Sequence, residues 1–313
     1  MSLLVTCQHG LGDNIYSRPF VRAAALKDSG PVYLSTPWPE LFEDLKMYGV
    51  QFVRPETRLR TQAKNVERQR PGLWVGAPLN ARTVRVGYNG ATLKAGLSVP
   101  RAIERVLPLR GAPFVFDLPY MGVSPVTTIG QPLAVIRPAT VRREWFNAAR
   151  NPKPEYIAAI AAELMTTHHV VVVADLQDGA EWLEGELPPH HQAFVRGELT
   201  VRDLLALVAA ADVVVGGVGW IVPAALALTR PAFIILGGHG GHNAPALITD
   251  ARMNLSQIYF AAPTEYCRCT DMKHNCTKEI PDLRLKWDTF RRTRLSRPSS
   301  PTPPPAPSLG GRS

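Results

Sequence analysis

Two glycine-rich turns constrain the fold of this 313-residue chain more than any other feature. The first, Gly10-Leu11-Gly12-Asp13, follows a short apolar run and precedes apolar residues at helical spacing over 15–26. The second, Gly216-Gly217-Val218-Gly219, stands between three valines and a stretch of small apolar residues at 220–228. A buried strand, a tight turn and a helix in this order form the repeating unit of a parallel α/β sheet. We therefore expect an α/β protein with two such turns.

The same alternation of strand and helix continues around both turns. In the first half, apolar runs predict strands at 3–6, 31–34, 50–53, 74–75 and 84–86, and helices at 15–26, 40–47 and 100–107. In the second half, strands are expected at 133–136, 169–174, 212–215 and 232–236, with helices that begin at Pro154, Thr200 and Trp220. The polar stretch 54–70, with six basic residues, predicts an exposed loop or helix on the first half.

These segments predict two Rossmann-like domains that face a cleft. We expect an N-terminal domain over residues 1–125 and a C-terminal domain over 130–283, joined where Gly, Ser, Pro and Thr cluster at 122–131. A terminal helix is expected over 284–295. The last residues, 296–313, are rich in Pro, Ser and Gly, and this composition predicts a disordered tail.

The net charge of +9 is concentrated in the first half of the chain. Residues 1–130 hold 16 Lys and Arg against 9 Asp and Glu, whereas residues 131–313 hold 19 against 17. A positive first half attracts polyanions such as nucleic acid or an anionic membrane, although the same charge also serves solubility. No apolar run is long enough to span a membrane, and the first residues predict a buried strand rather than a signal peptide. We expect a cytoplasmic protein, in the host cytoplasm if it is viral, with peripheral attachment to the inner membrane as the alternative.

The second glycine turn has the chemistry of a phosphate site. Such a turn exposes backbone N–H groups at the positive end of the following helix, and glycine permits close approach of a pyrophosphate. Gly217 and Gly219, beside Trp220, are therefore candidate phosphate ligands. The turn lacks the G-x-G-x-x-G fingerprint, and a plain tight turn is the alternative.

The segment after strand 133–136 is a second candidate for phosphate binding. It holds Arg137, Arg142, Arg143 and Trp145. Arginine matches phosphate oxygens with a planar fork, and an indole ring can stack on a base or a sugar. Ligands of open parallel sheets lie at the carboxyl ends of the strands, where this segment is expected. The alternative is a solvated loop with one packed tryptophan.

Asp13, which follows Gly10 and Gly12, is a candidate general base. A base must reach the proton that it removes and must stay ionised near neutral pH. The N-terminus of a helix keeps a carboxylate ionised, although it also weakens the basicity of that carboxylate. The alternative is a helix cap without a catalytic role.

Together, these segments resemble the heptosyltransferase-like enzymes of glycosyltransferase family 9 over about residues 1–280. The first turn, with Pro19 behind it, is similar to the family's glycine–aspartate turn and helix, and 137–145 is similar to its phosphate-holding loop. Thr200, Asp212 and the small-residue helix before Pro231 also resemble family segments. The resemblance implies a GT-B-like fold of two Rossmann-like domains, and it assigns Asp13 as the base that activates the acceptor hydroxyl.

The chain departs from the family pattern at the second turn. Where the family carries Asp-Ser-Gly followed closely by His, this chain has Gly217-Val218-Gly219 and Val222. The change removes two polar contacts to the donor and leaves backbone amides as the phosphate ligands. The implied fold is unaffected, whereas the family's heptose donor is not carried over.

Three of the four cysteines, Cys267, Cys269 and Cys276, lie close to His274 in the sequence. Three thiolates and an imidazole can form the tetrahedral shell of a structural Zn²⁺ ion. The C-x-C spacing is tighter than the usual C-x-x-C knuckle, however, and no second knuckle follows. A reduced cluster that stabilises a loop is the alternative. We expect no catalytic role for these residues and no required metal cofactor.

These observations predict an inverting, metal-independent glycosyltransferase whose donor is a nucleotide-diphosphate sugar. The acceptor is either a saccharide of the cell envelope or a hydroxymethylated base of viral DNA, which the basic first half favours. Two other functions use the same fold. One is a nucleotide-sugar epimerase or hydrolase, which turns over the donor without an acceptor, and the other is a non-catalytic protein that binds DNA or carbohydrate.

Overall fold

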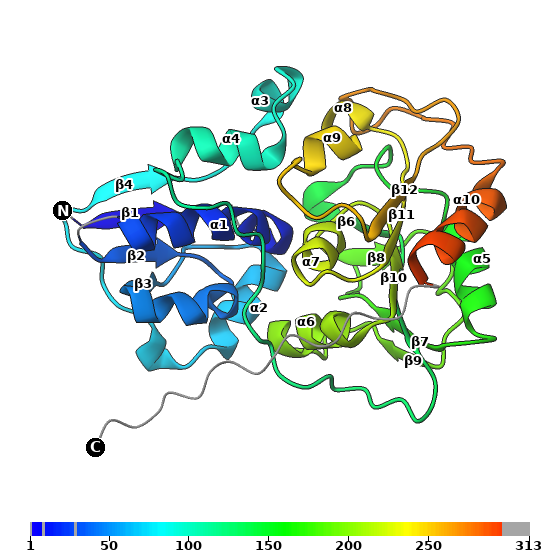
Figure 1. The fold of residues 1–313 in the computed structure, drawn as a ribbon, viewed down its shortest axis with the longest axis horizontal. Helices are drawn as coiled ribbons and strands as arrows, with labels where there is room; N and C mark the ends of the chain where they lie inside the picture. The colour runs from blue at the N-terminus through cyan, green and yellow to red at the C-terminus, as the bar shows by residue number, and fades with distance from the viewer. Residues whose placement is uncertain (1, 8–9, 28–29, 296–313) are drawn as a thin grey trace.

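A computed structural model describes residues 2–7, 10–27 and 30–295, and the tail expected at 296–313 lies outside the described residues. Two parallel sheets, each accompanied by helices, lie side by side (Figure 1). A short antiparallel pair of strands accompanies the second sheet. The expected α/β class is therefore confirmed.

The first sheet has four parallel strands in the order β3-β2-β1-β4. Their bounds are β1 (Leu3–Thr6), β2 (Val32–Ser35), β3 (Val50–Val53) and β4 (Arg82–Arg85). The helical elements of this half are α1 (Leu11–Lys27), η1 (Pro39–Tyr48), α2 (Arg60–Arg68), η2 (Pro71–Leu73), α3 (Gly90–Lys94) and α4 (Val99–Val106). Gly49 ends η1 with a φ of 84°, a left-handed conformation that glycine adopts without steric strain.

The second sheet has six parallel strands in the order β12-β11-β10-β5-β7-β9. Their bounds are β5 (Leu133–Arg137), β7 (His169–Val173), β9 (Gln192–Phe194), β10 (Val213–Gly216), β11 (Ala232–Ile235) and β12 (Ile258–Ala261), and the antiparallel pair is β6 (Thr140–Arg142) with β8 (Glu181–Leu183). The helical elements are η3 (Arg143–Trp145), α5 (Pro154–Leu164), α6 (Val201–Ala210), α7 (Ile221–Ala227), α8 (Gly240–Asn243), α9 (Pro245–Ile248), α10 (Leu283–Phe290) and η4 (Arg291–Leu295). Thr200 caps α6 as expected, in a capping box with Asp203.

Two expectations about local structure are wrong. The strand expected at 74–75 is a single bridge between Trp74 and Phe52, because prolines and glycines on both sides leave too few residues for a ladder. The segment 137–145, treated as a loop, contains strand β6, whose partner β8 lies far along the chain. A strand of only three residues is too short to show the alternation of apolar and polar side chains by which strands are predicted from sequence.

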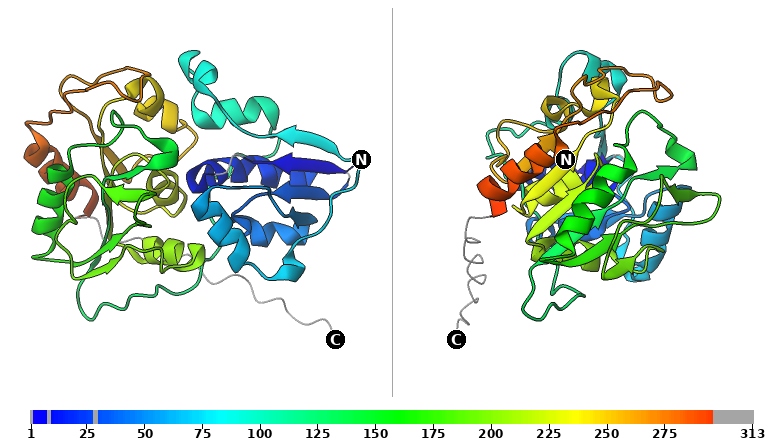
Figure 2. Two further views of the ribbon diagram at one scale, coloured as in Figure 1. Left: turned by 180° about the vertical axis from the view of Figure 1, so that it is seen from behind. Right: turned by 90° about the vertical axis from the view of Figure 1, so that its right-hand side faces the viewer.

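Helices α1 and α7 pack against each other at the interface between the two halves, and α3 and α4 pack on α8 and α9 beside them. A Cβ atom on Gly12 would lie 3.1 Å from Cα of Trp220, so a glycine in the first turn of α1 permits the close approach of α7. Tyr16 of α1 donates a hydrogen bond of 2.6 Å to the carbonyl of Ile248 in the other half. One hydrophobic cluster accordingly runs through both halves, and a second lies between the second sheet and helices α5 and α10. Figure 2 shows α5 (green) and α10 (orange-red) at the outer side of the second sheet.

Candidate active site

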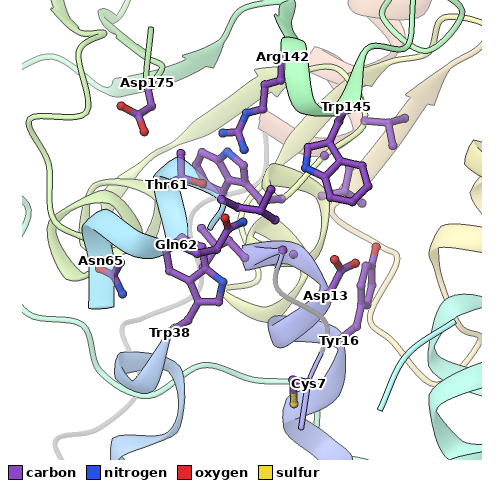
Figure 3. Close-up of a pocket in the computed structure, with 18 of the residues that line it drawn as sticks. Cys7, Asp13, Tyr16, Trp38, Thr61, Gln62, Asn65, Arg142, Trp145 and Asp175 are labelled. Atoms are coloured by element: carbon purple, nitrogen blue, oxygen red, sulfur yellow. The ribbon is translucent and has the colours of Figure 1, made fainter. Parts of the chain in front are cut away.

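A cavity of about 1180 Å³ lies between the two sheets, at the carboxyl ends of their strands. Open α/β sheets bind ligands at this position because the loops that follow the strands are free to carry functional side chains. The residues at or directly after strand ends that line the cavity include Cys7, Ser35, Arg54, Val86, Arg137, Ala174 and Phe194. Figure 3 shows side chains of both halves converging on this space.

Asp13 projects into the cavity from the first turn of α1 (Figure 3). Its Oδ1 accepts a hydrogen bond of 2.7 Å from the hydroxyl of Tyr88, and a side chain on Gly10 would overlap Oδ2. Burial raises the pKa of Asp13, while the Tyr88 hydroxyl, the charge of Arg150 and the Gly10 backbone lower it. Burial therefore outweighs the helix terminus, and a carboxylate with a raised pKa accepts a proton more readily near neutral pH.

Arg137 ends β5 and lies against the second glycine turn. A Cβ atom on Gly219 would be 3.0 Å from Nη1 of Arg137, so the missing side chain makes room for the guanidinium. Burial, reinforced by the charge of Arg150, lowers the pKa of Arg137 to about 10, and the group remains a cation at pH 7. Trp220 and Gly219 line the cavity, whereas Gly217 is buried against Pro152 and lies outside the wall.

The next two arginines occupy different environments. Arg142 lines the cavity with its Nε 2.7 Å from Oε2 of Glu181, a carboxylate only 3% exposed. Arg143 is exposed and lies outside the cavity wall. Trp145 lines the cavity with 61% of its surface exposed, and its ring can therefore stack on a bound ligand (Figure 3).

Helix α2 connects the two walls at the edge of the cavity. Arg60 lies 3.1 Å from both Asp175 and Glu181, and Nζ of Lys64 lies 2.7 Å from Oδ1 of Asp175. Arg68 adds hydrogen bonds to two backbone carbonyls of the second half. The basic stretch 54–70 is therefore not a uniformly exposed surface, because acidic residues of the second half attract α2. Part of its positive charge is neutralised within the protein.

Tyr88 and Arg150 also line the cavity, although the sequence did not single them out. Tyr88 follows closely after β4, so the tendency of ligand-binding residues to follow parallel strands could have identified it. Arg150 lies in the loop before α5, far beyond the end of β5. Only the packing of this loop on Gly237 and Gly238 brings it to the cavity, and no local pattern reveals that contact.

None of the four residues of the cysteine cluster lines the cavity, although Met272 of the same loop does. Nδ1 of His274 is 3.4 Å from Sγ of Cys267 and 3.3 Å from Sγ of Cys276, which in turn is 3.6 Å from Sγ of Cys269. All four potential ligand atoms lie within 4.8 Å of one another. Tetrahedral bonds of about 2.3 Å from zinc to sulfur place neighbouring ligand atoms about 3.8 Å apart, so the cluster has the size and the donor set of a thiophilic metal site.

The solved structures to which this chain is similar include a heptosyltransferase and an iron-containing glycosyltransferase. ADP-heptose LPS heptosyltransferase II of E. coli is 13% identical, with a TM-score of 0.54, over 93% of this chain and 98% of the other. The iron-containing dodecameric glycosyltransferase TibC of enterotoxigenic E. coli H10407 is 17% identical, with a TM-score of 0.60, over 93% of this chain and 76% of the other. The chain thus has a heptosyltransferase-like, GT-B-like fold, as the sequence resemblance implied. No family model and no curated protein matches the sequence.

Helices long and apolar enough to cross a membrane do not occur in the part of the chain that the structure describes.

Proposed function

We propose that the protein is a glycosyltransferase that moves a sugar from a nucleotide-diphosphate sugar to an acceptor hydroxyl. The observation that carries this proposal is the presence of Asp13 and Arg137 in the wall of one cavity between the two halves. A proton acceptor and a cation for a departing phosphate are the two groups that such a transfer needs. The likeness in fold to TibC, whose structure was solved in complex with ADP-D-β-D-heptose, supports this class of donor.

The transfer is a single displacement at the anomeric carbon. Asp13 removes the proton of the acceptor hydroxyl as its oxygen forms a bond to that carbon. The bond from the carbon to the diphosphate oxygen breaks, and the nucleoside diphosphate leaves with the electron pair next to Arg137. One displacement inverts the anomeric centre. Of the three other carboxylates in the cavity wall, Asp175 and Glu181 are engaged by Arg60, and Glu56 is exposed to solvent. This arrangement favours the single displacement over a covalent glycosyl-enzyme.

Product analysis with a panel of nucleotide sugars tests the proposal. Release of nucleoside diphosphate that depends on an acceptor, together with a mass increase of the acceptor by one sugar, is the expected result. Asp13→Asn should lower the transfer rate by about 10²- to 10⁴-fold and leave donor binding nearly intact. Glu155→Gln is the matched control, because Glu155 is an exposed acid in the first turn of α5. Donor turnover without an acceptor would instead identify an epimerase or hydrolase.

A saccharide is the acceptor that the charge distribution favours over DNA. The ion pairs of Arg60 and Lys64 with Asp175 and Glu181 use basic charge of 54–70 that a DNA acceptor would require. Binding to DNA weakens steeply as salt rises, whereas recognition of a neutral glycan does not. We therefore expect acceptor KM to be nearly constant between 50 and about 200 mM salt. A steep loss of affinity over this range would favour the DNA acceptor.

We also propose that the cysteine cluster holds a structural metal ion. The observation that favours it is the convergence of three sulfur atoms on Nδ1 of one imidazole. The cysteine loop also supports a neighbouring loop of the second half. The amides of Gly240 and Gly241 donate to the carbonyls of Cys267 and Cys269, at 2.7 and 3.0 Å. A bound ion would fix this arrangement by joining all four ligands, and thiols kept free for it are typical of a reducing cytoplasm.

Elemental analysis of the purified protein tests the metal proposal. About one equivalent of zinc or iron per chain is expected, and the absorption spectrum separates the two ions. Cys276→Ser should lose the metal and lower the unfolding temperature. Cys7→Ser, at a buried cysteine after β1, should keep the metal. A metal-free protein with a full complement of reactive thiols would support the reduced cluster instead.

A further inference from the structure

Arg150 lies on a loop whose backbone is fixed by several hydrogen bonds. The carbonyl of Ala149 accepts a hydrogen bond of 2.7 Å from the amide of Gly238, and the amide of Ala149 donates to the carbonyl of Met272 at 3.2 Å. A side chain on Gly237 would overlap the carbonyl oxygen of Arg150. The glycine loop after β11 therefore packs directly on this segment and holds Arg150 at the cavity wall.

The side chain of Arg150 is half-buried, and its guanidinium has incomplete hydrogen-bond partners. Its Nε is closed off from solvent and makes no hydrogen bond within the described chain. Among residues 2–7, 10–27 and 30–295, no carboxylate lies within ion-pair distance of Arg150 or of Arg137. A buried cation without a partner is costly, and such a group is suited to take an anion from the ligand.

The second half contributes three arginines to the cavity wall, of which Arg142 is paired with Glu181. From the first half, Lys64 is paired with Asp175, whereas Arg54, Arg68 and Arg85 also line the cavity. Arg137 and Arg150 are thus the two cations of the second half that are available to a bound anion. Burial lowers the pKa values of both guanidinium groups. The charge of Arg150 further lowers the pKa of Arg137, and the charge of Arg142 further lowers that of Arg150. Two adjacent cations of this kind match a diphosphate, which carries more than one negative charge and several acceptor oxygens.

Arg150 also borders the acceptor side of the cavity. The titratable and charged groups around it are Asp13, Tyr16 and Tyr88 from the first half, and Arg137, Arg142 and His239 from the second. The charge of Arg150 therefore lowers the pKa values of both Arg137 and Asp13.

We propose that Arg150 binds the departing diphosphate together with Arg137 and thereby couples occupancy of the donor site to the proton affinity of Asp13. This inference rests on the transferase function proposed above. In the free protein, the charge of Arg150 lowers the pKa of Asp13. A diphosphate neutralises that charge, so the pKa of Asp13 rises when the donor binds. The carboxylate then becomes a stronger base when a donor is present to accept the nucleophile. By linkage, protonation of Asp13 in turn favours binding of the anion.

Calorimetric titration with inorganic pyrophosphate tests the first part of the inference. Arg150→Gln should weaken pyrophosphate binding by about 10- to 100-fold, the effect of losing a charge-assisted hydrogen bond. Arg143→Gln makes the same change at an exposed residue outside the cavity and should alter affinity less than about twofold. Arg150→Lys keeps the charge and should retain part of the pyrophosphate affinity. This second variant serves as the test if Arg150→Gln fails to fold. Wild-type affinity in Arg150→Gln, or no pyrophosphate binding by the wild type, overturns the inference.

Proton uptake tests the coupling to Asp13. Titrations in two buffers of different ionisation enthalpy should show that the wild type takes up more protons with pyrophosphate than Asp13→Asn does. Arg150→Gln should lose the same extra uptake, which a purely structural role for Arg150 would leave in place. Equal uptake in the wild type and Asp13→Asn overturns the coupling. Failure of the transferase proposal is recognised separately, by the absence of sugar transfer in the wild type.

Discussion

Tyr88 donates a hydrogen bond of 2.7 Å to Oδ1 of Asp13 from the loop between β4 and α3. Strands β1 and β4 are neighbours in the first sheet. Asp13 lies in the helix that follows β1, and Tyr88 lies in the loop that follows β4, so the two side chains meet at the same edge of the sheet. Burial raises the pKa of Asp13, and the hydrogen bond from the Tyr88 hydroxyl lowers it. The proton affinity of the proposed base is therefore set by a balance between these two effects.

Tyr88→Phe should move the acidic limb of the kcat/KM profile to higher pH. The variant loses the hydrogen bond that stabilises the ionised carboxylate, so the pKa of Asp13 rises further and less of the base is ionised at neutral pH. The limb should move by about one pH unit or more, since hydrogen bonds to charged groups contribute about 1.5–3 kcal/mol. An unchanged limb would show that Asp13 does not titrate in the rate-limiting step.

Asp13→Asn should stabilise the folded protein above acidic pH while it removes activity. The folded pKa of Asp13 is raised above its unfolded value, so the folded state binds this proton more tightly. The resulting contribution to stability is fully present below the unfolded pKa and is lost as pH rises through the folded pKa. Unfolding temperatures measured from pH 4 to 8 should therefore diverge, with the variant higher by about 2 °C or more at the upper end. Glu155→Gln should show no such divergence, and parallel curves for Asp13→Asn would contradict the burial of a charge at this site.

Local patterns were sufficient for most of the fold and for one residue on each wall of the cavity. Strand β3 lies at the residues expected from its apolar run, and Gly49 and Thr200 end and begin helices as their conformational preferences indicate. Asp13 and Arg137 could be placed at strand ends because parallel sheets bring these ends together. Such features depend only on residues that are close in sequence.

The remaining features depend on contacts between segments distant in sequence. Nothing local indicates that β6 pairs with β8, that α2 faces Asp175, or that Arg150 reaches the cavity. The raised pKa of Asp13 also depends on tertiary structure, because burial outweighs the helix terminus on which the sequence argument relied. Arg143 and Gly217 match phosphate chemistry equally well in sequence, yet only the three-dimensional packing shows that they lie outside the cavity wall.

Gly197→Ala should open the contact between α2 and the second half. Gly197 has a φ of 67°, and a side chain there would overlap both Asp175 and Lys64, which form an ion pair of 2.7 Å. We expect a loss of about 2 kcal/mol or more, from backbone strain of about 1–2 kcal/mol and from the separated ion pair. Gly96→Ala is the control, because Gly96 has a φ of 76° and open space around it. The free energies of unfolding are measured by chemical denaturation, and the difference between the two variants gives the contribution of the ion pair. Equal losses of unfolding free energy would show that the contact between α2 and the second half contributes nothing.

Gly219→Ala should weaken donor binding with little effect on stability. A Cβ atom on this residue would lie 3.0 Å from Nη1 and 3.2 Å from Cζ of Arg137, so the guanidinium must move away from the position in which it faces the diphosphate. The displaced group is the end of a flexible side chain, and the fold should therefore tolerate the change. We expect donor KM to rise by about tenfold, the loss of about one charge-assisted hydrogen bond, with a smaller change in kcat. Gly72→Ala, at an exposed glycine with open space around it, should leave KM and the unfolding temperature at wild-type values. If Gly219→Ala also retains the wild-type donor KM, Arg137 does not hold the phosphate from this position, and the donor side of the proposed mechanism must be reassigned.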